Sequence, residues 1–174
     1  LIAAVFAACY TGEIGAVFRG CYLILLTPSP LVTDYFAIGG LSSALLNAGA
    51  CGLACFVFMV CLKGDSHVNT LAGFFLVIAH CFYGLNFLNM WPCFLAPILF
   101  LRRRKLDLKA NLHICMFSTS FAPFISEFLF RYTRHGEYVF GKPEVTIFGV
   151  LVAILFSILI GFMVPVILPG AKSW

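Results

Sequence analysis

Charged residues are scarce in this sequence. Asp, Glu, Lys and Arg make up 10% of its 174 residues, whereas hydrophobic residues make up 62%. Ordinary soluble domains carry about 25% charged residues, because their surfaces face water. A soluble fold of this size could not cover its surface with so few charges. The sequence therefore predicts an integral membrane protein.

Motifs for catalysis and metal binding are also lacking. The sequence contains no nucleophile motif, no Walker loop, no paired catalytic carboxylates and no HExxH. None of the eight cysteines forms a CxxC pair, and no His or second cysteine pair joins Cys51 and Cys55. We expect no enzyme, no cofactor, no metal site and no disulfide framework. The net charge of +4 is small and localised, so we expect no nucleic-acid partner.

One long uncharged run organises the chain. No charged residue occurs between Asp34 and Lys63, and about 20 apolar residues suffice for a helix to cross a bilayer. Residues 35–62 are therefore predicted to span, with Thr33 or Asp34 as the N-cap. Asn47 should face protein rather than lipid. Small residues at every fourth position predict close packing of another helix: Gly40, Ala44, Ala48 and Gly52.

Four further segments besides the stretch 68–101 belong to the expected fold. Residues 1–10 look like the end of a helix that begins upstream, and residues 12–26 form an amphipathic helix expected to lie flat in the membrane interface. Residues 108–129 and 145–168 are expected to span. We expect an all-α polytopic transmembrane bundle, with residues 1–174 as one membrane domain. The last span has a second stripe of small residues: Gly149, Ala153, Ser157 and Gly161. Two matching stripes favour close helix packing, and packing on each other is one option.

Residues 68–101 present a problem of length. As a helix these 34 residues would reach about 51 Å, whereas two membrane crossings need roughly 60 Å. Breaks near Gly84–Asn86 and at Pro92 and Pro97 predict a bent or re-entrant hairpin. Irregular backbone at membrane depth is tolerated only next to protein or a wet cavity, so this hairpin is a candidate pore lining. The alternative is two short, bent helices in thin contact with lipid.

One basic cluster indicates the topology. The positive-inside rule places it in the cytoplasm, which makes the loop 131–144 external. The cluster follows the hairpin directly and contains Arg102, Arg103, Arg104, Lys105 and Lys109.

Polar residues inside the predicted spans are the candidates for a solute path. Pro123 removes a backbone donor and would free the carbonyl of Thr119, which creates a polar notch; the alternative is that the hydroxyls there bond their own helix. Glu127 is either a ligand for a proton or cation or the partner of Arg131 four residues on. The path candidates are Asn47, Asn86, Asn89, Thr119, Ser120, Pro123, Ser126 and Glu127.

Four motifs together resemble a known family. They are LVTDYFAIGGLSSALLNAG (31–49), NMWPCFLAP (89–97), STSFAPFISE (118–127) and IGFMVP (160–165). In this order they resemble DUF1576, a family of bacterial and archaeal multi-pass membrane proteins without an assigned activity. The resemblance implies an integral protein of a prokaryotic cell membrane. Family members are about twice as long, so it also implies that this chain is an N-terminal half whose partner is the missing second half.

The function expected from these observations is a transporter or channel for a small solute or ion. The alternative is a non-transporting membrane scaffold or assembly subunit, which the two small-residue stripes would suit. The expected partners are the lipid bilayer, the second half of the same protein and, as an option, further copies of the chain.

Overall fold

The computed structural model describes residues 14–30, 32–64, 67–134, 136 and 138–168. Within these residues the fold is all-helical, as predicted, and contains no strand. The expected helix end at residues 1–10 lies outside the described residues. In chain order the described elements are α2 (Ile14–Leu26), α3 (Tyr35–Cys61), α4 (Val68–His80), α5 (Met90–Arg103), α6 (Leu112–Ser118), the short 3₁₀-helix η1 (Thr119–Phe121), α7 (Ala122–Phe130) and α8 (Ile147–Ile167).

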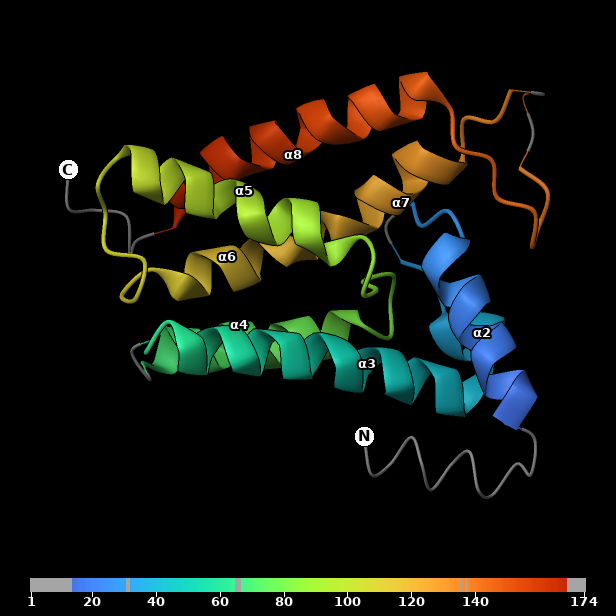
Figure 1. The fold of residues 1–174 in the computed structure, drawn as a ribbon, viewed down its shortest axis with the longest axis horizontal. Helices are drawn as coiled ribbons and strands as arrows, with labels where there is room; N and C mark the ends of the chain where they lie inside the picture. The colour runs from blue at the N-terminus through green and yellow to red at the C-terminus, as the bar shows by residue number, and fades with distance from the viewer. Residues whose placement is uncertain (1–13, 31, 65–66, 135, 137, 169–174) are drawn as a thin grey trace.

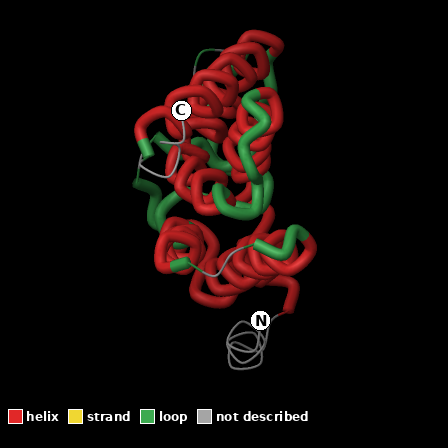
Figure 2. The backbone as a smooth tube through the Cα atoms, turned by 90° about the vertical axis from the view of Figure 1, so that its left-hand side faces the viewer, coloured by secondary structure: helices red, strands yellow, loops and turns green. Residues whose placement is uncertain are grey.

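The helices form two layers (Figures 1 and 2). Helices α2, α3 and α4 make one layer, and α5 to α8 make the other, with α4 packed against α6 where the layers meet. The chain passes from the first layer to the second through residues 81–89. This turn therefore lies between the layers, where Leu85, Asn86 and Asn89 are buried while Tyr83, Phe87 and Leu88 are exposed at the surface.

Three helical segments are long and apolar enough to cross a membrane: Tyr35–Cys61, Leu112–Phe130 and Ile147–Ile167. They agree with the three predicted spans, although the second begins at Leu112 rather than at residue 108, because residues 108–111 form a turn. Their outer faces expose large apolar side chains, including Phe56 and Leu155. A soluble protein rarely exposes so much apolar surface, and the chain is a membrane helix bundle.

Helix α3 begins at the predicted cap and then bends. The Asp34 carboxylate accepts the backbone N–H groups of Phe36 at 2.9 Å and Ala37 at 3.1 Å, which satisfies two donors at the helix start. Gly40 has φ 77° and ψ 168°, a conformation that essentially only glycine adopts. Gly40 is exposed, and a Cβ added to it would meet no atom within 4 Å. Its predicted part in helix packing is wrong; it bends the helix instead.

Helix α2 runs across the direction of the long helices and packs against the first turns of α3 (Figure 1). The backbones touch where Gly20 meets Gly39, since a Cβ on Gly20 would collide with the Gly39 carbonyl oxygen. The outer face of α2 exposes Ile14, Phe18 and Tyr22. An apolar face on a helix that lies across the bundle is compatible with the predicted interfacial position.

The predicted hairpin is broken in its middle. Helix α4 has 13 residues and α5 has 14, so each is about 20 Å long and shorter than a hydrocarbon core of about 30 Å. Helix α4 begins and α5 ends at the same end of the bundle, and the turn 81–89 between them lies between the layers (Figure 1). This is the arrangement of a re-entrant hairpin.

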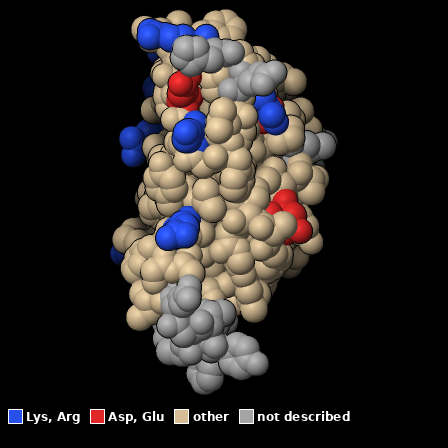
Figure 3. Space-filling view, turned by 90° about the vertical axis from the view of Figure 1, so that its right-hand side faces the viewer, with Lys and Arg blue, Asp and Glu red and all other residues tan. Residues whose placement is uncertain are grey.

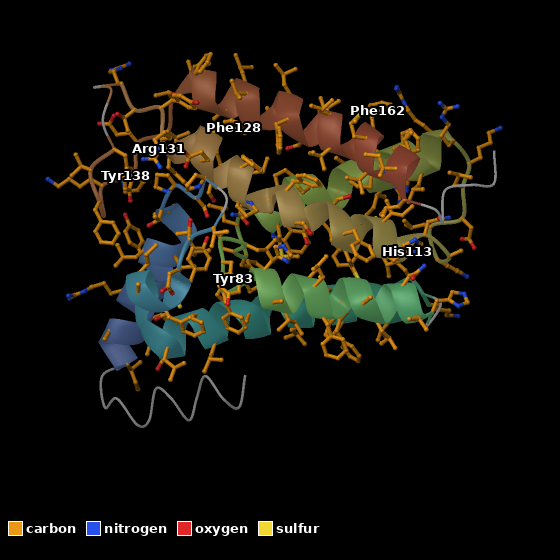
Figure 4. All side chains as sticks on the ribbon, turned by 180° about the vertical axis from the view of Figure 1, so that it is seen from behind. Tyr83, His113, Phe128, Arg131, Tyr138 and Phe162 are labelled. Atoms are coloured by element: carbon orange, nitrogen blue, oxygen red, sulfur yellow. The ribbon has the colours of Figure 1, made fainter. Side chains whose placement is uncertain are left out.

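The two ends of the bundle differ in charge. The last turn of α5 and the loop after it carry the five exposed basic side chains of the predicted cytoplasmic cluster. Figure 3 views the opposite end, where charges of both signs are scattered over a mostly uncharged surface. In Figure 4, Arg131 and Tyr138 lie at that opposite end, and His113 and Phe162 lie towards the end with the basic loop. The positive-inside rule predicts that the hairpin enters from the cytoplasmic side.

Candidate functional site

The turn of the hairpin contains a run of backbone carbonyls that do not accept hydrogen bonds in the regular pattern of a helix. Five consecutive carbonyls, from residue 81 to residue 85, accept hydrogen bonds from outside the turn or from its far side. Tyr35 alone provides two donors: its backbone N–H reaches the Phe82 oxygen at 3.2 Å, and its hydroxyl reaches the Gly84 oxygen at 2.7 Å. Unpaired backbone groups at membrane depth cost several kcal/mol each. The bonds from α3 and its N-terminal flank therefore hold the turn in place.

Asn47 is the second support of the turn. Its amide nitrogen donates to the Cys81 oxygen at 3.1 Å and to the Leu85 oxygen at 2.9 Å, and its Oδ1 accepts the backbone N–H of Phe87 at 3.1 Å. The side chain is 6% exposed. The prediction that Asn47 faces protein is confirmed.

Asn86 and Asn89 close the turn on itself. The Asn89 Oδ1 accepts the backbone N–H of Asn86 at 2.8 Å, and the Asn86 Oδ1 accepts that of Asn89 at 2.9 Å. This reciprocal pairing resembles a capping box and fixes the start of α5. Both side-chain carbonyl oxygens are thereby used within the turn. The Asn89 NH₂ group also donates to the Gly84 carbonyl of the turn at 2.9 Å, and both NH₂ groups reach neighbouring segments.

These NH₂ groups build a cluster of polar side chains from four separate positions. Asn86 Nδ2 donates to the Tyr35 hydroxyl oxygen and to the Ile24 carbonyl, both at 3.0 Å. Asn89 Nδ2 donates to the Ser126 hydroxyl oxygen at 2.9 Å. We call Tyr35, Asn86, Asn89 and Ser126 the hairpin cluster; each is at most 1% exposed. None of its side chains carries a charge, so the cluster can recognise a ligand through hydrogen bonds alone.

The broken span α6–η1–α7 satisfies its own backbone. The Thr119 carbonyl accepts the N–H of Ala122 within the 3₁₀ turn, so the prediction that Pro123 leaves this carbonyl free is wrong. The Thr119 hydroxyl donates to the Met116 carbonyl at 2.7 Å, which is the alternative stated above. A 3₁₀ turn pairs the carbonyl with a donor three residues on, so it is no longer available as a notch. Ser120 is half-buried on the same turn.

The hydrogen bonds of the Glu127 carboxylate in the described structure go to Arg131 and not to the hairpin cluster. Its Oε1 is 2.7 Å from the Nε of Arg131, which is 47% exposed. The hydrogen bond with this carboxylate raises the pKa of Arg131. This is the interfacial ion pair that the four-residue spacing predicts.

The two small-residue stripes do not pack on each other. On α8, a Cβ at Gly149 would collide with the Phe128 carbonyl oxygen, and one at Gly161 would lie 2.6 Å from the Ala96 Cβ. Helix α8 thus packs closely on α7 and α5, with Ala153 and Ser157 buried between. On α3, Ala44 and Ala48 are buried, and a Cβ at Gly52 would lie 3.4 Å from the Ile78 side chain. Apart from the exposed Gly40, both stripes are covered within the chain.

A small cavity adjoins the hairpin cluster. It has a volume of about 190 Å³ and lies between α2, α3 and Phe87 of the turn. Asn47 and Ile24 line it and also hold the turn. The residues of the hairpin cluster do not line the cavity; its other lining residues are Cys21, Leu25, Leu46 and Ala50.

Sequence reasoning found most of this site but missed Tyr35. Asn47, Asn86, Asn89 and Ser126 were predicted from polar residues in apolar surroundings, and the structure brings them to one turn. Tyr35 directly follows the cap of α3, and a buried tyrosine usually gives its hydroxyl a partner. That rule could have identified it as a polar group at the helix start.

Comparisons with known proteins identify one family. The family model described as "Protein of unknown function (DUF1576)" matches residues 14–172, which is nearly the whole chain. A search of curated proteins and a search of solved structures each found no match.

Proposed function

The chain belongs to the DUF1576 family, and we propose that it transports or conducts a small solute or ion across a prokaryotic cell membrane. The observation that carries the proposal is the hairpin cluster: four neutral polar side chains, each at most 1% exposed, gathered at the turn of a re-entrant hairpin. Broken helices that meet inside a membrane protein recur as solute sites in transporters. The absence of charge from these four side chains favours an uncharged, hydrogen-bonding solute within this class.

The proposed mechanism is an exchange of hydrogen bonds. In the closed arrangement Asn89 donates to Ser126 at 2.9 Å and Asn86 donates to Tyr35 at 3.0 Å. A solute that enters between the layers takes over these two donors and loses its hydration shell in return. No covalent step is required, and the cavity of about 190 Å³ beside Phe87 gives the turn room to shift.

A scaffold or assembly subunit is the second candidate. It was expected from the small-residue stripes, but α5, α7 and the hairpin already cover them in the same chain. The hairpin cluster has no part in that function, so the geometry favours transport.

Flux through proteoliposomes tests the proposal. The full-length protein is reconstituted, and the entry of urea, glycerol and KCl is followed by stopped-flow light scattering. Ser126→Ala removes the acceptor of Asn89 without adding bulk, so we expect flux of the conducted probe to change severalfold. Ser157→Ala is the matched control, because that buried hydroxyl bonds only the Ala153 carbonyl of its own helix in the described structure. Flux of every probe equal to that of empty vesicles, or unchanged flux in both variants, would contradict transport through this site.

Chemical labelling tests the same site without knowing the solute. Ser126→Cys is made in a Cys61→Ser background, because Cys61 is the exposed cysteine among those described. A solute path predicts that a small water-soluble methanethiosulfonate reagent modifies the new thiol in membranes and changes flux. A thiol that stays unmodified during conduction would place the path elsewhere.

A further inference from the structure

A groove between the last turn of α5 and the facing side of α8 is not used by the hairpin cluster. It has a volume of about 540 Å³ and is lined by Ala96, Leu99, Phe100, Ile158 and Phe162, with Arg102 and Arg103 at its rim. The groove lies at the end of the bundle that carries the basic loop, where Figure 4 shows Phe162 near a group of nitrogen-tipped side chains.

The floor and walls of the groove are rigidly built. Phe100, 4% exposed, meets Phe162 edge to face with ring centroids 5.4 Å apart. Below them α5 and α8 are in close contact, since a Cβ on Gly161 would lie 2.6 Å from that of Ala96. These two contacts between α5 and α8 therefore form the floor of the groove.

The groove faces outward, towards the position of lipid chains. Leu99 is 64% exposed, Ile158 is 49% exposed and Phe162 is 48% exposed. Neither α3 nor α4 covers this side, because α8 contacts α5, α6 and α7. The apolar length of the groove would therefore contact hydrocarbon in a bilayer.

The rim supplies charge of one sign. Arg102 and Arg103 are exposed in the last turn of α5, and no acid is among the residues that line the groove. The acid nearest in sequence, Asp107, accepts the backbone N–H of Lys109 at 3.1 Å. Guanidinium groups form bidentate hydrogen bonds with phosphate oxygens, which an ammonium cannot do.

We propose that this groove binds an anionic glycerophospholipid of the cytoplasmic leaflet. Its phosphate lies between Arg102 and Arg103, and one acyl chain lies along Leu99, Ile158 and Phe162. The assignment rests on the arrangement of the groove, which has arginines at one end and apolar side chains next to them. A lipid has the same arrangement, with its charge at the interface and its acyl chain directly below. Basic pockets between membrane helices on the cytoplasmic side recognise such headgroups. The inference is independent of solute transport.

Lipid titration tests the site. The purified full-length protein in dodecyl maltoside is titrated with dioleoyl phosphatidylglycerol or dioleoyl phosphatidylcholine, and bound lipid is counted by native mass spectrometry. We expect the wild type to retain one phosphatidylglycerol in preference to phosphatidylcholine. Arg102→Gln/Arg103→Gln should weaken retention of phosphatidylglycerol about tenfold or more. Ile158→Trp, which fills the groove without removing charge, should weaken binding of the same lipid.

Lys105→Asn/Lys109→Gln is the matched control. It removes two positive charges from the loop after α5 but none from the groove, and asparagine tolerates the positive φ of 57° at position 105. Equal loss of phosphatidylglycerol in the two double variants would show attraction by net charge alone and overturn the proposal. Equal affinity of the wild type for the two lipids would overturn it as well. Complete displacement of the bound phosphatidylglycerol by glycerol phosphate, which lacks acyl chains, would also overturn the proposal.

Discussion

The side-chain amide of Asn47 donates to the carbonyl oxygen of Leu85 over 2.9 Å, and this bond ties the middle of α3 to the turn of the re-entrant hairpin. The same amide also reaches Cys81, and its oxygen accepts the N–H of Phe87. One side chain on a continuous helix therefore holds three backbone groups of a segment that has no helix of its own. The hairpin cluster depends on this support, because the position of Asn86 and Asn89 follows from that of the turn.

Replacing Asn47 should destabilise the fold. Asn47→Leu keeps a similar volume but leaves two carbonyls and one N–H without their partner, at a cost of about 2–4 kcal/mol. The free energy of unfolding is measured in mixed micelles of dodecyl maltoside and SDS. Asn69→Leu is the control, because Asn69 is exposed at the start of α4 and should change stability by about 0.5 kcal/mol or less. Equal stability of the two variants would show that the turn does not need Asn47.

Close packing of α8 on α5 should make Gly161 intolerant of any side chain. In Gly161→Ala the new methyl would lie 2.6 Å from the Ala96 Cβ and 2.9 Å from the Ala96 carbonyl carbon. Because the helices must separate to admit it, we expect a loss of about 1–3 kcal/mol in the same unfolding assay. Gly15→Ala in α2 meets nothing within 4 Å and should be neutral or stabilising by up to about 1 kcal/mol. A stabilised Gly161→Ala would contradict the observed helix contact.

Gly40 should be intolerant for a different reason. Gly40→Ala also meets nothing within 4 Å, but its φ of 77° is unfavourable for any residue with a Cβ. We expect a loss of about 1–3 kcal/mol, or a straightened α3 detectable by a change in the α2–α3 distance between spin labels. If Gly40→Ala behaved like Gly15→Ala in both measurements, the kink would not be a property of the folded protein.

The charge difference between the two ends predicts the orientation. Asp107→Cys, in the basic loop, should react with a membrane-impermeant maleimide only after the cells are permeabilised. Lys142→Cys, in the exposed loop before α8, should react in intact cells. Both variants are made in the Cys61→Ser background so that the exposed native thiol does not contribute. The reverse labelling pattern would place the hairpin entrance on the outer side of the membrane.

The sequence predicted the helices and their breaks because those signals are local. Asp34 caps a helix from its own position, and Gly84 permits a turn whatever surrounds it; its φ is 123°. The length of residues 68–101 likewise limited the hairpin to less than two crossings. Each of these inferences needs only the neighbouring residues and the thickness of a bilayer.

Which helices would meet was beyond the sequence. Gly149 and Gly161 indicate that another helix packs closely on α8, but they do not indicate which one. In the structure these helices are α7 and α5 rather than α3. In an ideal α-helix Pro123 would leave the Thr119 carbonyl without a donor. Because the helix winds as a 3₁₀ turn here, the N–H of Ala122 donates to that carbonyl instead. The first error concerns the choice of a distant partner, which depends on the fold of the whole chain, and the second concerns the local winding of the helix.

The partners of Asn47 lie 34, 38 and 40 residues further along the chain. The segment that accepts and donates these bonds therefore follows α3 in the chain and is inserted after it. In lipid without the hairpin, the Asn47 carboxamide would lack the three backbone partners that it has in the folded chain. These hydrogen bonds of Asn47 therefore form only once the hairpin has been inserted beside α3, late in the assembly of the fold.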